Sequence, residues 1–595
     1  MNKQLILSIM VVASLLAVLP ASVSADQYVS TTSDIQAAVD QAAANGGTVY
    51  FASGEYYVNI VIDTPARSFT LKGAGSEESE LYADDDGAVI KVVNTGANVV
   101  TIEGFGIREG TGDTSGYVIS PCGGGLYSNY ANLVVENCRF QNNEAGYGGG
   151  MYNENYTYGD ATYSNSGDPP YAVVVRDCHF EDNGANYGGG MYNYEVASIS
   201  VINCTFEENY ASVDGGGMYN DNSNVVVESC TFDRNEAGNE GGGMVNYYSS
   251  SASASPGGDT DYDGEILTED IVTLSVSNCT FTNNEAGNRG GGMYNEEYSA
   301  PLVSKCIFVG NEAIRGGGGM HNHDSSAPVV TNCVFVANVV IGESDTPRGI
   351  DGQAEIIRSA GGGGMFSGPY ATPVVTNCTF TLNTVPYYSN KGDYDGENGG
   401  GVKNANNSSS VFTNCIIWGN VCGDDPNDVL NTDGNTSTFE YCNIGGGFPG
   451  EGNIDADPLF VNAPTNLSLG AGSPCIDTGT NLVSWGSLGG VMDDILGTPR
   501  PQRLGYDMGA YEYVGTSFSP VIIQPLARTQ LQSVLSLWEE LLSRLPEEPT
   551  DEMASLIAQI QEHVGNAAQL TNPIYASGQL SKAAAAMQQL AALLA

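Results

Sequence analysis

Apolar and polar positions recur along this chain with a long, nearly fixed period. Between residues 134 and 420 a phrase of the form V-x-N-C-x-F-x-x-N-x-A returns nine times, usually followed by G-G-G-M-Y-N. In the shortest units the cysteines are 26 or 27 residues apart. A period of this size predicts a stack of repeated units. Each unit has two short β-runs and no helix-length segment, which predicts a right-handed parallel β-helix with about three strands per coil.

The spacing inside one unit predicts where the chain turns. Cys138 and Phe140 are two residues apart and share one face of a strand, whereas Val135 and Cys138 are three apart, which strand alternation forbids. We therefore expect a corner at the Asn that precedes most of these cysteines, because Asn tolerates the left-handed conformation. A second Asn, three residues after each Phe, predicts the next corner and a ladder of hydrogen-bonded Asn side chains.

Other parts of the repeat carry weaker predictions. The Gly triplets allow the backbone to bend where no side chain fits. In the Met-Tyr-Asn phrase that follows, we expect Met to face inward and Tyr outward.

The ends of the chain differ from the repeats. The first residues have the pattern of a secretory signal cleaved after Ala25, with an uncleaved anchor as the alternative. A capped amphipathic helix from Ser33 to Asn45 suits a lid on an open solenoid. The C-terminal part of the chain has three stripes of apolar residues at helical spacing. They predict a bundle of three helices or, as the alternative, a surface on which a partner docks. The predicted domains are a signal peptide (1–25), a cap and first coils (26–119), regular repeats (120–445), a less regular β segment (446–515) and a helical bundle (516–595).

Charge restricts the partners. The net charge is −49 with only 20 Lys and Arg, which excludes nucleic acid and disfavours anionic membranes and polyuronates. So acidic a surface either binds divalent cations or keeps a secreted protein soluble. After the signal no segment is long and apolar enough to cross a bilayer, so we expect no membrane span in the mature chain and a secreted or cell-surface location.

The thirteen cysteines would ordinarily suggest disulfides in a secreted chain. Nine of them occupy one inward position of the repeat, however, where free Cys serves as core filler. Neighbouring coils also present their Cβ atoms side by side, a poor geometry for a disulfide. We expect the ladder to be largely reduced. Four cysteines lie off the series, Cys122, Cys422, Cys442 and Cys475, and a disulfide of Cys422 is the expected exception.

Three groups of phrases resemble known families. Phe140-Gln141-Asn142-Asn143 with Gly149-Gly150-Met151 resembles the repeats of chlamydial polymorphic outer-membrane proteins, which are surface adhesins. Ile35 to Val39 with Gly46 to Tyr50 resembles the N-terminal cap of pectate-lyase-like β-helix proteins. Asp457 to Val461, Leu469 to Asp477 and Asp507 to Tyr513 are similar to the choice-of-anchor Q module.

The resemblance covers roughly residues 30 to 515 and implies a β-helix surface protein that binds other surfaces. The adhesins end in a membrane β-barrel and this chain ends in helical stripes, so outer-membrane autotransport does not carry over. Pectate-lyase-like folds host lyases, hydrolases and binding proteins, so the fold alone specifies no chemistry.

One acidic segment resembles a calcium-binding loop. Carboxylates at positions 1, 3 and 5, Gly at 6 and Asp at 12 are the arrangement in which hard oxygen ligands surround Ca²⁺. Flanking helices are absent, and an acidic insertion without a metal is the alternative. The predicted ligands are Asp259, Asp261, Asp263, Glu265 and Asp270.

Two insertions supply the other functional signal, because loops on a rigid scaffold carry binding. One follows the Met-Tyr-Asn corner of an early coil and the other follows the same corner three coils later. Since three coils span about 14 Å at strand spacing, we expect the loops to wall one cleft, whose aromatic side chains suit neutral sugar rings. The predicted ligand-binding residues are Tyr156, Tyr158, Tyr163, Tyr247 and Tyr248.

Two basic features complete the candidates. His321 and His323 place two imidazoles on one strand face, where they either bind a transition metal or, as we expect, replace the usual residues at an exposed position. Arg289 and Arg315 occupy matching places in neighbouring repeats and could form a basic pair for lyase chemistry or balance surface acid.

No complete catalytic constellation is visible, and we assign no catalytic residue. The predicted function is a non-catalytic, secreted or cell-surface protein that binds a polysaccharide or a cell-surface protein. The alternatives are a polysaccharide lyase or glycoside hydrolase acting in the cleft, and a structural envelope component.

Overall fold

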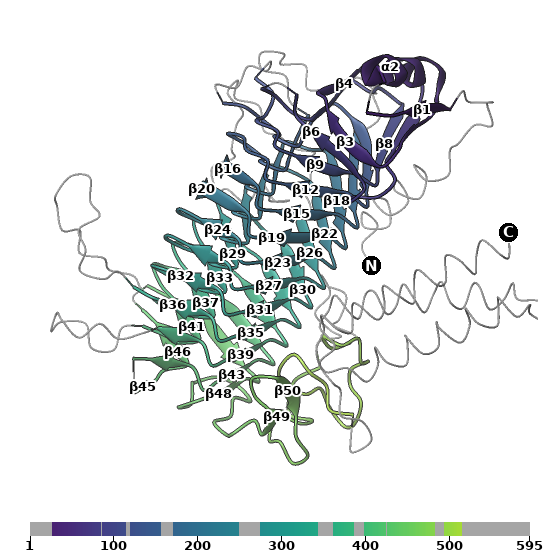
Figure 1. The fold of residues 1–595 in the computed structure, drawn as a ribbon. Helices are drawn as coiled ribbons and strands as arrows, with labels where there is room; N and C mark the ends of the chain where they lie inside the picture. The colour runs from purple at the N-terminus through teal and green to yellow at the C-terminus, as the bar shows by residue number, and fades with distance from the viewer. Residues whose placement is uncertain are drawn as a thin grey trace, which may run out of the picture. The chain divides into compact units, whose positions relative to one another are not determined.

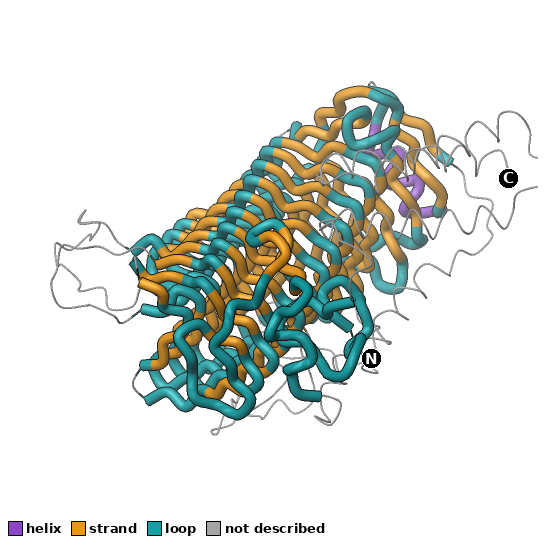
Figure 2. The backbone as a smooth tube through the Cα atoms, turned by 90° about the horizontal axis from the view of Figure 1, so that it is seen from below, coloured by secondary structure: helices purple, strands orange, loops and turns teal. Residues whose placement is uncertain are grey.

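The computed structural model describes residues 26–514 apart from 32, 85, 115–119, 156–170, 249–273, 343–360, 386–397, 424, 433 and 482–492. In this part the chain is a parallel β-helix, with strands of successive coils paired rung on rung (Figures 1 and 2). The predicted solenoid is therefore confirmed. The signal peptide and the predicted helical bundle lie outside the described residues.

Two long sheets run from the first coils to the last. Sheet 1 has fourteen strands: β1 (Gln27–Val29), β2 (Gly47–Phe51), β5 (Phe69–Lys72), β8 (Val99–Glu103), β11 (Asn132–Glu136), β14 (Ala172–Arg176), β18 (Ser198–Ile202), β22 (Val225–Glu228), β26 (Leu274–Ser277), β30 (Leu302–Ser304), β34 (Val329–Thr331), β38 (Val374–Thr376), β42 (Val411–Thr413) and β47 (Thr438–Glu440). Sheet 2 has thirteen: β3 (Gly54–Tyr57), β6 (Ser79–Tyr82), β9 (Gly106–Arg108), β12 (Arg139–Gln141), β15 (His179–Glu181), β19 (Thr205–Glu207), β23 (Thr231–Asp233), β27 (Thr280–Thr282), β31 (Ile307–Val309), β35 (Val334–Val336), β39 (Thr379–Thr381), β43 (Ile416–Trp418) and β48 (Asn443–Ile444).

The other two sheets close each coil. Sheet 3 has twelve strands: β4 (Ile60–Asp63), β7 (Ile90–Val93), β10 (Leu126–Asn129), β13 (Met151–Glu154), β17 (Met191–Tyr194), β21 (Met218–Asp221), β25 (Met244–Tyr247), β29 (Met293–Glu296), β33 (Met320–Asn322), β37 (Met365–Ser367), β41 (Val402–Asn404) and β46 (Val429–Asn431). Sheet 4 has nine: β16 (Gly184–Tyr187), β20 (Tyr210–Asp214), β24 (Glu236–Ala237), β28 (Glu285–Ala286), β32 (Glu312–Ala313), β36 (Val339–Val340), β40 (Thr384–Val385), β44 (Val421–Cys422) and β45 (Asp425–Pro426).

From β16 onward the chain passes through sheets 1, 2, 4 and 3 in each coil. Sheet 4 corrects the expectation of about three strands per coil. Most of its strands have only two residues, which is too short to leave an alternation of apolar and polar positions in the sequence.

The interior of the coils is built from ladders of identical side chains. Phe140, Phe180 and Phe206 belong to a column of fully buried, parallel rings whose centroids are 4.6 and 4.7 Å apart. Each such contact adds to the burial of two large apolar side chains. Because every rung repeats the same residue, a slip by one coil would keep the core intact, whereas a slip by one residue would expose it.

The cysteines form a second ladder, and all thirteen are free thiols. The amide N–H of Cys204 donates to Sγ of Cys230 at 3.4 Å, and the Cys204 thiol lies 3.7 Å from the Val175 carbonyl of the coil before. Cys442 corrects the prediction that it lies off the series, because the Cys415 amide donates to its Sγ at 3.4 Å and it continues the column.

The corner predicted before each cysteine is present. The residue at this position has a positive φ, as at Asn137 (53°), Asn203 (53°) and Asn278 (54°), and other residue types occupy it in a few coils. At the second corner the left-handed residue is one place before the predicted Asn, as at Asn142 (φ 55°). The Asn that follows is therefore free to turn its side chain into the coil.

This second Asn forms the predicted ladder. Asn209 is fully buried, and its Nδ2 donates to Oδ1 of Asn235 and to the Phe180 carbonyl, both at 2.9 Å. Its Oδ1 in turn accepts from Nδ2 of Asn183 at 2.9 Å. The column satisfies buried polar groups that would otherwise destabilise the interior. It runs through Asn143, Asn183, Asn209, Asn235, Asn284, Asn311, Asn338, Asn383 and Asn420.

The Gly triplets stand where neighbouring coils approach most closely. Gly148 has a φ of 63°, and a Cβ on Gly149 would lie 2.4 Å from the Gly184 carbonyl oxygen and 2.6 Å from that of Gly189. No other residue fits such a contact. The Gly triplet therefore lets the chain enter sheet 3 at a place where the neighbouring coil leaves no room for a side chain.

The first coil is covered by the predicted helix. The helix α2 (Ile35–Asn45) begins at Asp34, whose side chain accepts from the Ala37 amide, and ends at Gly46. Ile35, Val39 and Ala42 are its buried residues. The chain turns from sheet 2 to sheet 3 between β3 and β4.

The chain divides into two compact units, Met1–Leu459 with Gly472–Tyr513 and Phe460–Ala471 with Val514–Ala595. The described part of the second contains an antiparallel hairpin, β49 (Phe460–Asn462) and β50 (Asn466–Leu469).

In the first unit the described residues of the segment 472–513 contact the coils. Asp493 pairs with Lys305 at 2.7 Å, and the Ala510 amide donates to Thr379 Oγ1 at 3.0 Å. The fully buried Arg500 side chain donates to Glu512 at 3.1 Å and to the Gly509 carbonyl at 2.7 Å. Residues of the Asp507 to Tyr513 phrase therefore stabilise this segment through hydrogen bonds to Arg500.

Replacing Asn209 by Leu is expected to lower the free energy of unfolding by about 3 kcal/mol or more, because it strands buried donors and acceptors in both neighbouring coils. The melting temperature of the full chain measures this. Asn186→Leu is the control, since Asn186 is exposed and its side chain accepts only from Ser212. Equal losses in the two variants would contradict the role of the ladder.

Candidate functional site

Both large insertions begin at the C-terminal end of a strand of sheet 3. Residues 156–170 follow β13 closely and 249–273 follow β25, three coils further along the same sheet. Tyr247 is the last residue of β25, and Tyr248 next to it has 41% of its surface exposed, with ring centroids 4.5 Å apart. The other predicted ligand-binding residues, Tyr156, Tyr158 and Tyr163, lie outside the described residues.

The coils from β10 to β21 carry a column of outward tyrosines. The second residue of most of these strands is Tyr, and the stacked rings of Tyr127, Tyr152, Tyr192 and Tyr219 have centroids 5.7, 5.5 and 5.0 Å apart. Tyr faces outward as predicted, but each of these rings is at least 92% buried. They form an apolar cluster separate from the core of the coils.

Half-buried tyrosines flank this column on both sides. Tyr147 and Tyr187 stack at 5.4 Å along one edge, and Tyr194 and Tyr247 lie along the other, at the ends of β17 and β25. We call this set of side chains, with the buried column, the tyrosine face of sheet 3. Its rim presents aromatic surface to solvent, and its floor is closed by the buried rings.

Carboxyl groups are set into the tyrosine face. Glu154 accepts from the hydroxyls of Tyr127 and Tyr152, the latter at 2.9 Å, and burial raises its pKa. Asp221 accepts from the Tyr192 hydroxyl at 3.2 Å, and burial raises its pKa to about 7. The carboxyl groups of Glu154 and Asp221 are two coils apart because the fourth residue of successive strands is in turn an acid and a Tyr. The neighbours in register are Glu154, Tyr194, Asp221 and Tyr247.

Two more carboxyl groups lie at the other edge of the same face. Glu240 is 8% exposed and pairs with Arg289 at 3.0 Å, yet burial and the nearby Glu296 raise its pKa to about 7. Asp214, one coil earlier, has a raised pKa for the same principal reason, burial. Carboxyl groups that hold a proton near neutral pH can donate hydrogen bonds as well as accept them.

Two expectations about basic residues are wrong. His321 is 2% exposed rather than on the surface, because its ring lies between those of Tyr294 and Phe366 at centroid distances of 5.4 and 4.5 Å. Arg289 pairs in register with Gly316, so Arg315 does not occupy the matching place and the two do not form a basic pair. Arg289 instead balances acid, as the alternative had it, because it forms an ion pair with Glu240. Among the described residues no group of three or more His, Cys, Asp or Glu side chains could hold a metal ion.

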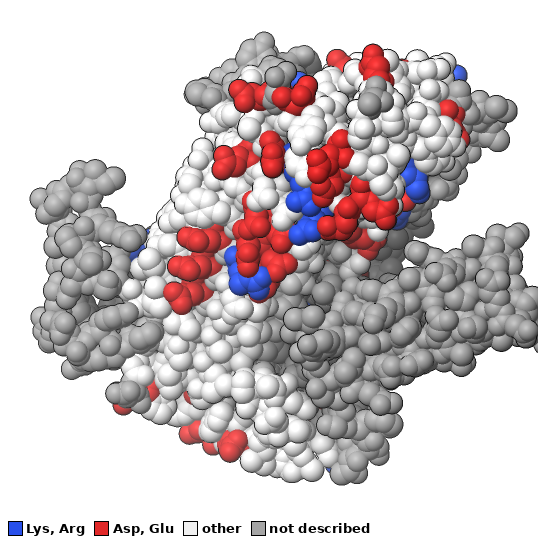
Figure 3. All heavy atoms as spheres, in the orientation of Figure 1, with Lys and Arg blue, Asp and Glu red and all other residues white. Residues whose placement is uncertain are grey.

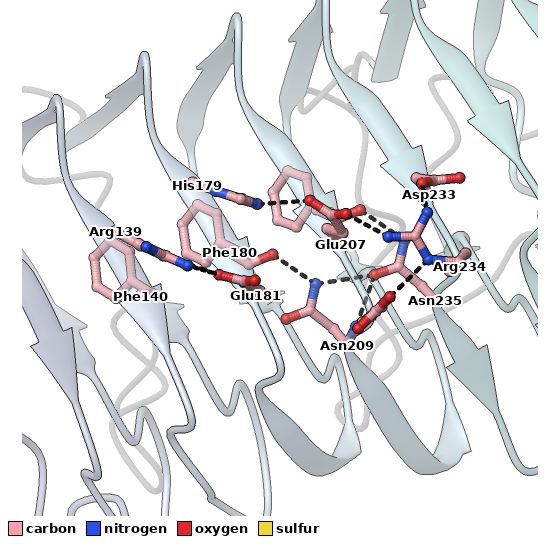
Figure 4. Close-up of polar contacts among 12 residues, drawn as sticks. Arg139, Phe140, His179, Phe180, Glu181, Glu207, Asn209, Asp233, Arg234 and Asn235 are labelled. Atoms are coloured by element: carbon pink, nitrogen blue, oxygen red, sulfur yellow. Dashed lines mark hydrogen bonds and ion pairs between the residues drawn. The ribbon is translucent and has the colours of Figure 1, made fainter. Parts of the chain in front are cut away.

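Sheet 2 carries a different surface, on which acidic and basic side chains gather (Figure 3). Arg139 pairs with Glu181, and Arg234 pairs with Glu207, Asp233 and Glu208, the last at 2.7 Å (Figure 4). His179 lies 3.1 Å from Glu207. The charges on these rungs are compensated by one another, and exposed pairs of this kind contribute little, so sheet 2 offers no comparable site.

The predicted calcium ligands Asp259, Asp261, Asp263, Glu265 and Asp270 lie outside the described residues. Sequence reasoning missed Glu154, Asp221 and Glu240. The signal for the first two was present, since an acid follows Met-Tyr-Asn in their repeats, but their burial depends on contacts between coils. No helix in the described ranges is long and apolar enough to cross a membrane.

Neither a known family nor a curated protein matches the sequence. Solved structures similar to the chain include a tailspike protein of Escherichia coli O157:H7 bacteriophage CAB120, at 12% identity and a TM-score of 0.29, covering 70% of this chain and 46% of that protein. A second is the ORF18 protein of Geobacillus virus E2, at 12% identity and a TM-score of 0.27, covering 75% of this chain and 65% of that protein. A third is the catalytic domain of a GH87 alpha-1,3-glucanase in complex with nigerose, at 13% identity and a TM-score of 0.28, covering 70% of each chain. The chain thus spans about half the length of the tailspike.

The raised pKa values predict a pH-dependent stability. Asp221 and Glu240 bind protons more tightly in the folded state than in the unfolded state, so their contribution is present at low pH and is lost as pH rises through about 7. We expect the melting temperature to fall between about pH 4 and pH 7, the range between the ordinary and the raised pKa values of these carboxyl groups. Asp221→Asn should remove up to about 4 kcal/mol of this dependence, at about 1.4 kcal/mol per pKa unit.

The exposed Asp86 provides the control. The Asp86→Asn variant is expected to keep the pH dependence of the unmodified chain. A melting temperature that does not change with pH, or that changes equally in both variants, would show that Asp221 is not held protonated.

Proposed function

We propose that this chain is a secreted or cell-surface protein that binds a neutral polysaccharide along the tyrosine face of sheet 3. The observation that supports this most directly is the rim of half-buried tyrosines, Tyr187, Tyr194 and Tyr247, beside carboxyl groups with raised pKa values. Aromatic faces contact the apolar face of a sugar ring, and the carboxyl groups exchange hydrogen bonds with its hydroxyls.

The regular spacing of the face suits an extended chain of sugars. In-register strands about 4.8 Å apart repeat the same kind of side chain from coil to coil. A polymer lying along the stack therefore meets aromatic and polar groups again and again. The net charge of −49 favours a neutral polymer over a polyuronate, because an anionic chain would be repelled.

The resemblance to adhesin repeats supports binding to a surface, and the resemblance to the choice-of-anchor Q module supports attachment of the protein itself to a cell or matrix. Both remain resemblances of sequence phrases. A cell-surface protein as partner is the alternative form of the same function, and it would use the same exposed aromatic rim.

The double variant Tyr194→Ala and Tyr247→Ala is expected to bind neutral polysaccharides at least about tenfold more weakly, because tyrosine is enriched among the interface residues whose truncation costs about 1 kcal/mol or more. A glycan array followed by titration calorimetry measures this. Tyr28→Ala is the control, since Tyr28 is 77% exposed on sheet 1 in the first coil. Loss of binding in the control, or unchanged binding in the double variant, would contradict the proposed face.

A glycoside hydrolase is the second candidate function, and the pKa values of about 7 at Asp221 and Glu240 favour it. Such a carboxyl group can protonate the oxygen that leaves a glycosidic bond while another carboxylate activates water. Release of reducing ends from the bound polysaccharide, lost in Asp221→Asn or Glu240→Gln, would establish hydrolysis. Binding without product would leave the protein as a non-catalytic binder.

A calcium site in the acidic segment stays part of the proposal. If Asp259, Asp261 and Asp263 bind Ca²⁺ in the folded state, millimolar Ca²⁺ should raise the melting temperature of the full chain. Changing all three to Ala should abolish that rise. A rise that survives the triple change would place the bound calcium elsewhere on the acidic surface.

A further inference from the structure

Three exposed tyrosines stand at the corner where the chain leaves sheet 3 toward sheet 1. Tyr248 directly follows β25, Tyr298 follows β29 by two residues, and Tyr370 follows β37 by three. Their side chains are 41%, 38% and 60% exposed, and they belong neither to the core of the coils nor to the buried tyrosine column. We call Tyr248, Tyr298 and Tyr370 the corner row.

The backbone at this corner is left-handed, which is an unfavourable conformation for tyrosine. The φ angles of Tyr248, Tyr298 and Tyr370 are 46°, 60° and 57°. A bulky side chain with a positive φ is an outlier because its Cβ crowds the backbone, whereas Asn tolerates this region. Asn222 and Asn407 occupy the same corner in other coils, with φ angles of 44° and 63°. The fold therefore requires a left-handed residue here, but it does not require tyrosine.

A side chain that is both strained and exposed points to a function. The corner row loses free energy to its backbone conformation, and rings that remain so exposed offset little of that loss by burial. An Asn would make the same turn with less strain. Residues held in such conformations gather at sites that bind ligands. We conclude that the exposed rings act on something outside the coils.

Two rings of the corner row lie along the axis of the stack. The Tyr298 amide donates to the Asp324 carbonyl, and the Ser325 amide donates to the Pro369 carbonyl. In a parallel ladder these bonds make Tyr298, Ser325 and Tyr370 neighbours on successive coils. The two tyrosines are therefore two coils apart, about 10 Å at strand spacing, and only the small Ser325 separates them.

The surroundings of these rings indicate which ligand fits. Ser325 and Asn407 flank Tyr370 along the stack, so the rings stand in single file among polar residues. A protein interface would instead need an apolar patch that is broad at its centre. The carboxylate of Glu297, next to Tyr298 in the chain, repels an anionic polymer and accepts hydrogen bonds from hydroxyl groups. A thin, uncharged polymer of hydroxyl-bearing rings meets these conditions.

The corner row is continuous with the tyrosine face of sheet 3. The ring centroid of Tyr248 lies 4.5 Å from that of Tyr247, which is part of the rim. Burial and a hydrogen bond to Glu297 raise the pKa of Tyr247, so the residue that precedes Tyr298 also touches the rim. A polymer on the rim therefore lies next to the first rings of the corner row.

We propose that the corner row is a second line of stacking positions for a neutral polysaccharide, in which Tyr298 and Tyr370 each contact the apolar face of one sugar unit. This inference rests on the proposed function. It goes beyond that function because it extends the binding surface from β25 to the coils of β29, β33 and β37, and because it assigns the contacts to residues that the fold itself does not require.

The variants Tyr298→Asn and Tyr370→Asn separate binding from stability in the full chain. Asn relieves the backbone strain, so we expect each variant to melt at a temperature at least as high as the unmodified chain. The lost ring should weaken binding of a neutral hexasaccharide by about threefold or more in each variant. Titration calorimetry measures this with cellohexaose, laminarihexaose and xylohexaose as probes.

Two matched controls accompany these variants. Leu382→Asn makes the same change at a different left-handed corner, because Leu382 follows β39 of sheet 2 with a φ of 58° and is 39% exposed. It should melt no lower than the unmodified chain and bind as tightly. Tyr298→Phe keeps the ring at the corner row and should also bind as tightly.

The outcomes separate the two proposals. If a saccharide binds and Tyr194→Ala with Tyr247→Ala weakens it, but both Asn variants at the corner row bind normally, the corner row is wrong and the proposed function stands. If no saccharide binds, both fail.

The melting temperatures decide the remaining cases. Asn variants at the corner row that melt lower than the unmodified chain would show that the rings are structural and would overturn the inference. Weaker binding of Tyr298→Asn and Tyr370→Asn at an undiminished melting temperature, with both controls unaffected, supports it.

Discussion

The whole structure depends on coils that stack in register, and the buried Asn ladder is the interaction that holds this register. Between the ends of the column, each Asn donates to the next Asn and to a backbone carbonyl of the previous coil, and it accepts from the Asn before it, as Asn209 does. A shift by a single residue would leave all of these amides buried and unpaired, at about 1–3 kcal/mol for each group. The apolar Phe column stabilises the stack of coils, whereas the Asn column makes one register of the stack more stable than the others.

Stacking in register also decides how side chains on the outside are arranged. A residue type that recurs at one position of the repeat forms a row of side chains along the coils. Because each sheet contains different positions of the repeat, the sheets have different surfaces. On sheet 2 acidic and basic side chains of neighbouring rungs pair with one another, as Arg139 with Glu181 shows. On sheet 3 the rows are aromatic and acidic, and neighbouring rungs bury one another's carboxyl groups. The raised pKa of Asp221 is therefore a consequence of the same geometry that holds the core.

Much of the fold could be predicted because its determinants are local. The two-residue step from Cys138 to Phe140, the left-handed Asn137 and the Gly triplets each require one kind of backbone, and the period of the phrase supplies the stacking. The strands of sheet 4 were not predictable, since a two-residue strand has no alternation to detect. Cys442 was placed off the ladder because its repeat is degenerate in sequence, although its backbone continues the column.

The site was less predictable, and the reason is physical. Tyr247 and Tyr248 stand out in sequence as part of an aromatic insertion, but burial is a property of neighbouring coils that are 26 to 49 residues away in the chain. His321 was expected on the surface because the sequence offers no obvious third ligand with which it could bind a metal. Its ring is instead enclosed by Tyr294 and Phe366, which no spacing within one repeat reveals.

The central claim is that the outward face of sheet 3 is the binding surface. Hydrogen–deuterium exchange of the full chain, measured by mass spectrometry with and without a neutral polysaccharide, tests it most directly because it reports on every sheet at once. Our account predicts that the polysaccharide slows exchange in peptides that contain β17, β21, β25 and β29 and leaves the strands of sheet 1 unchanged. Protection confined to sheet 1 or sheet 2, or no protection when binding is saturated, would contradict it.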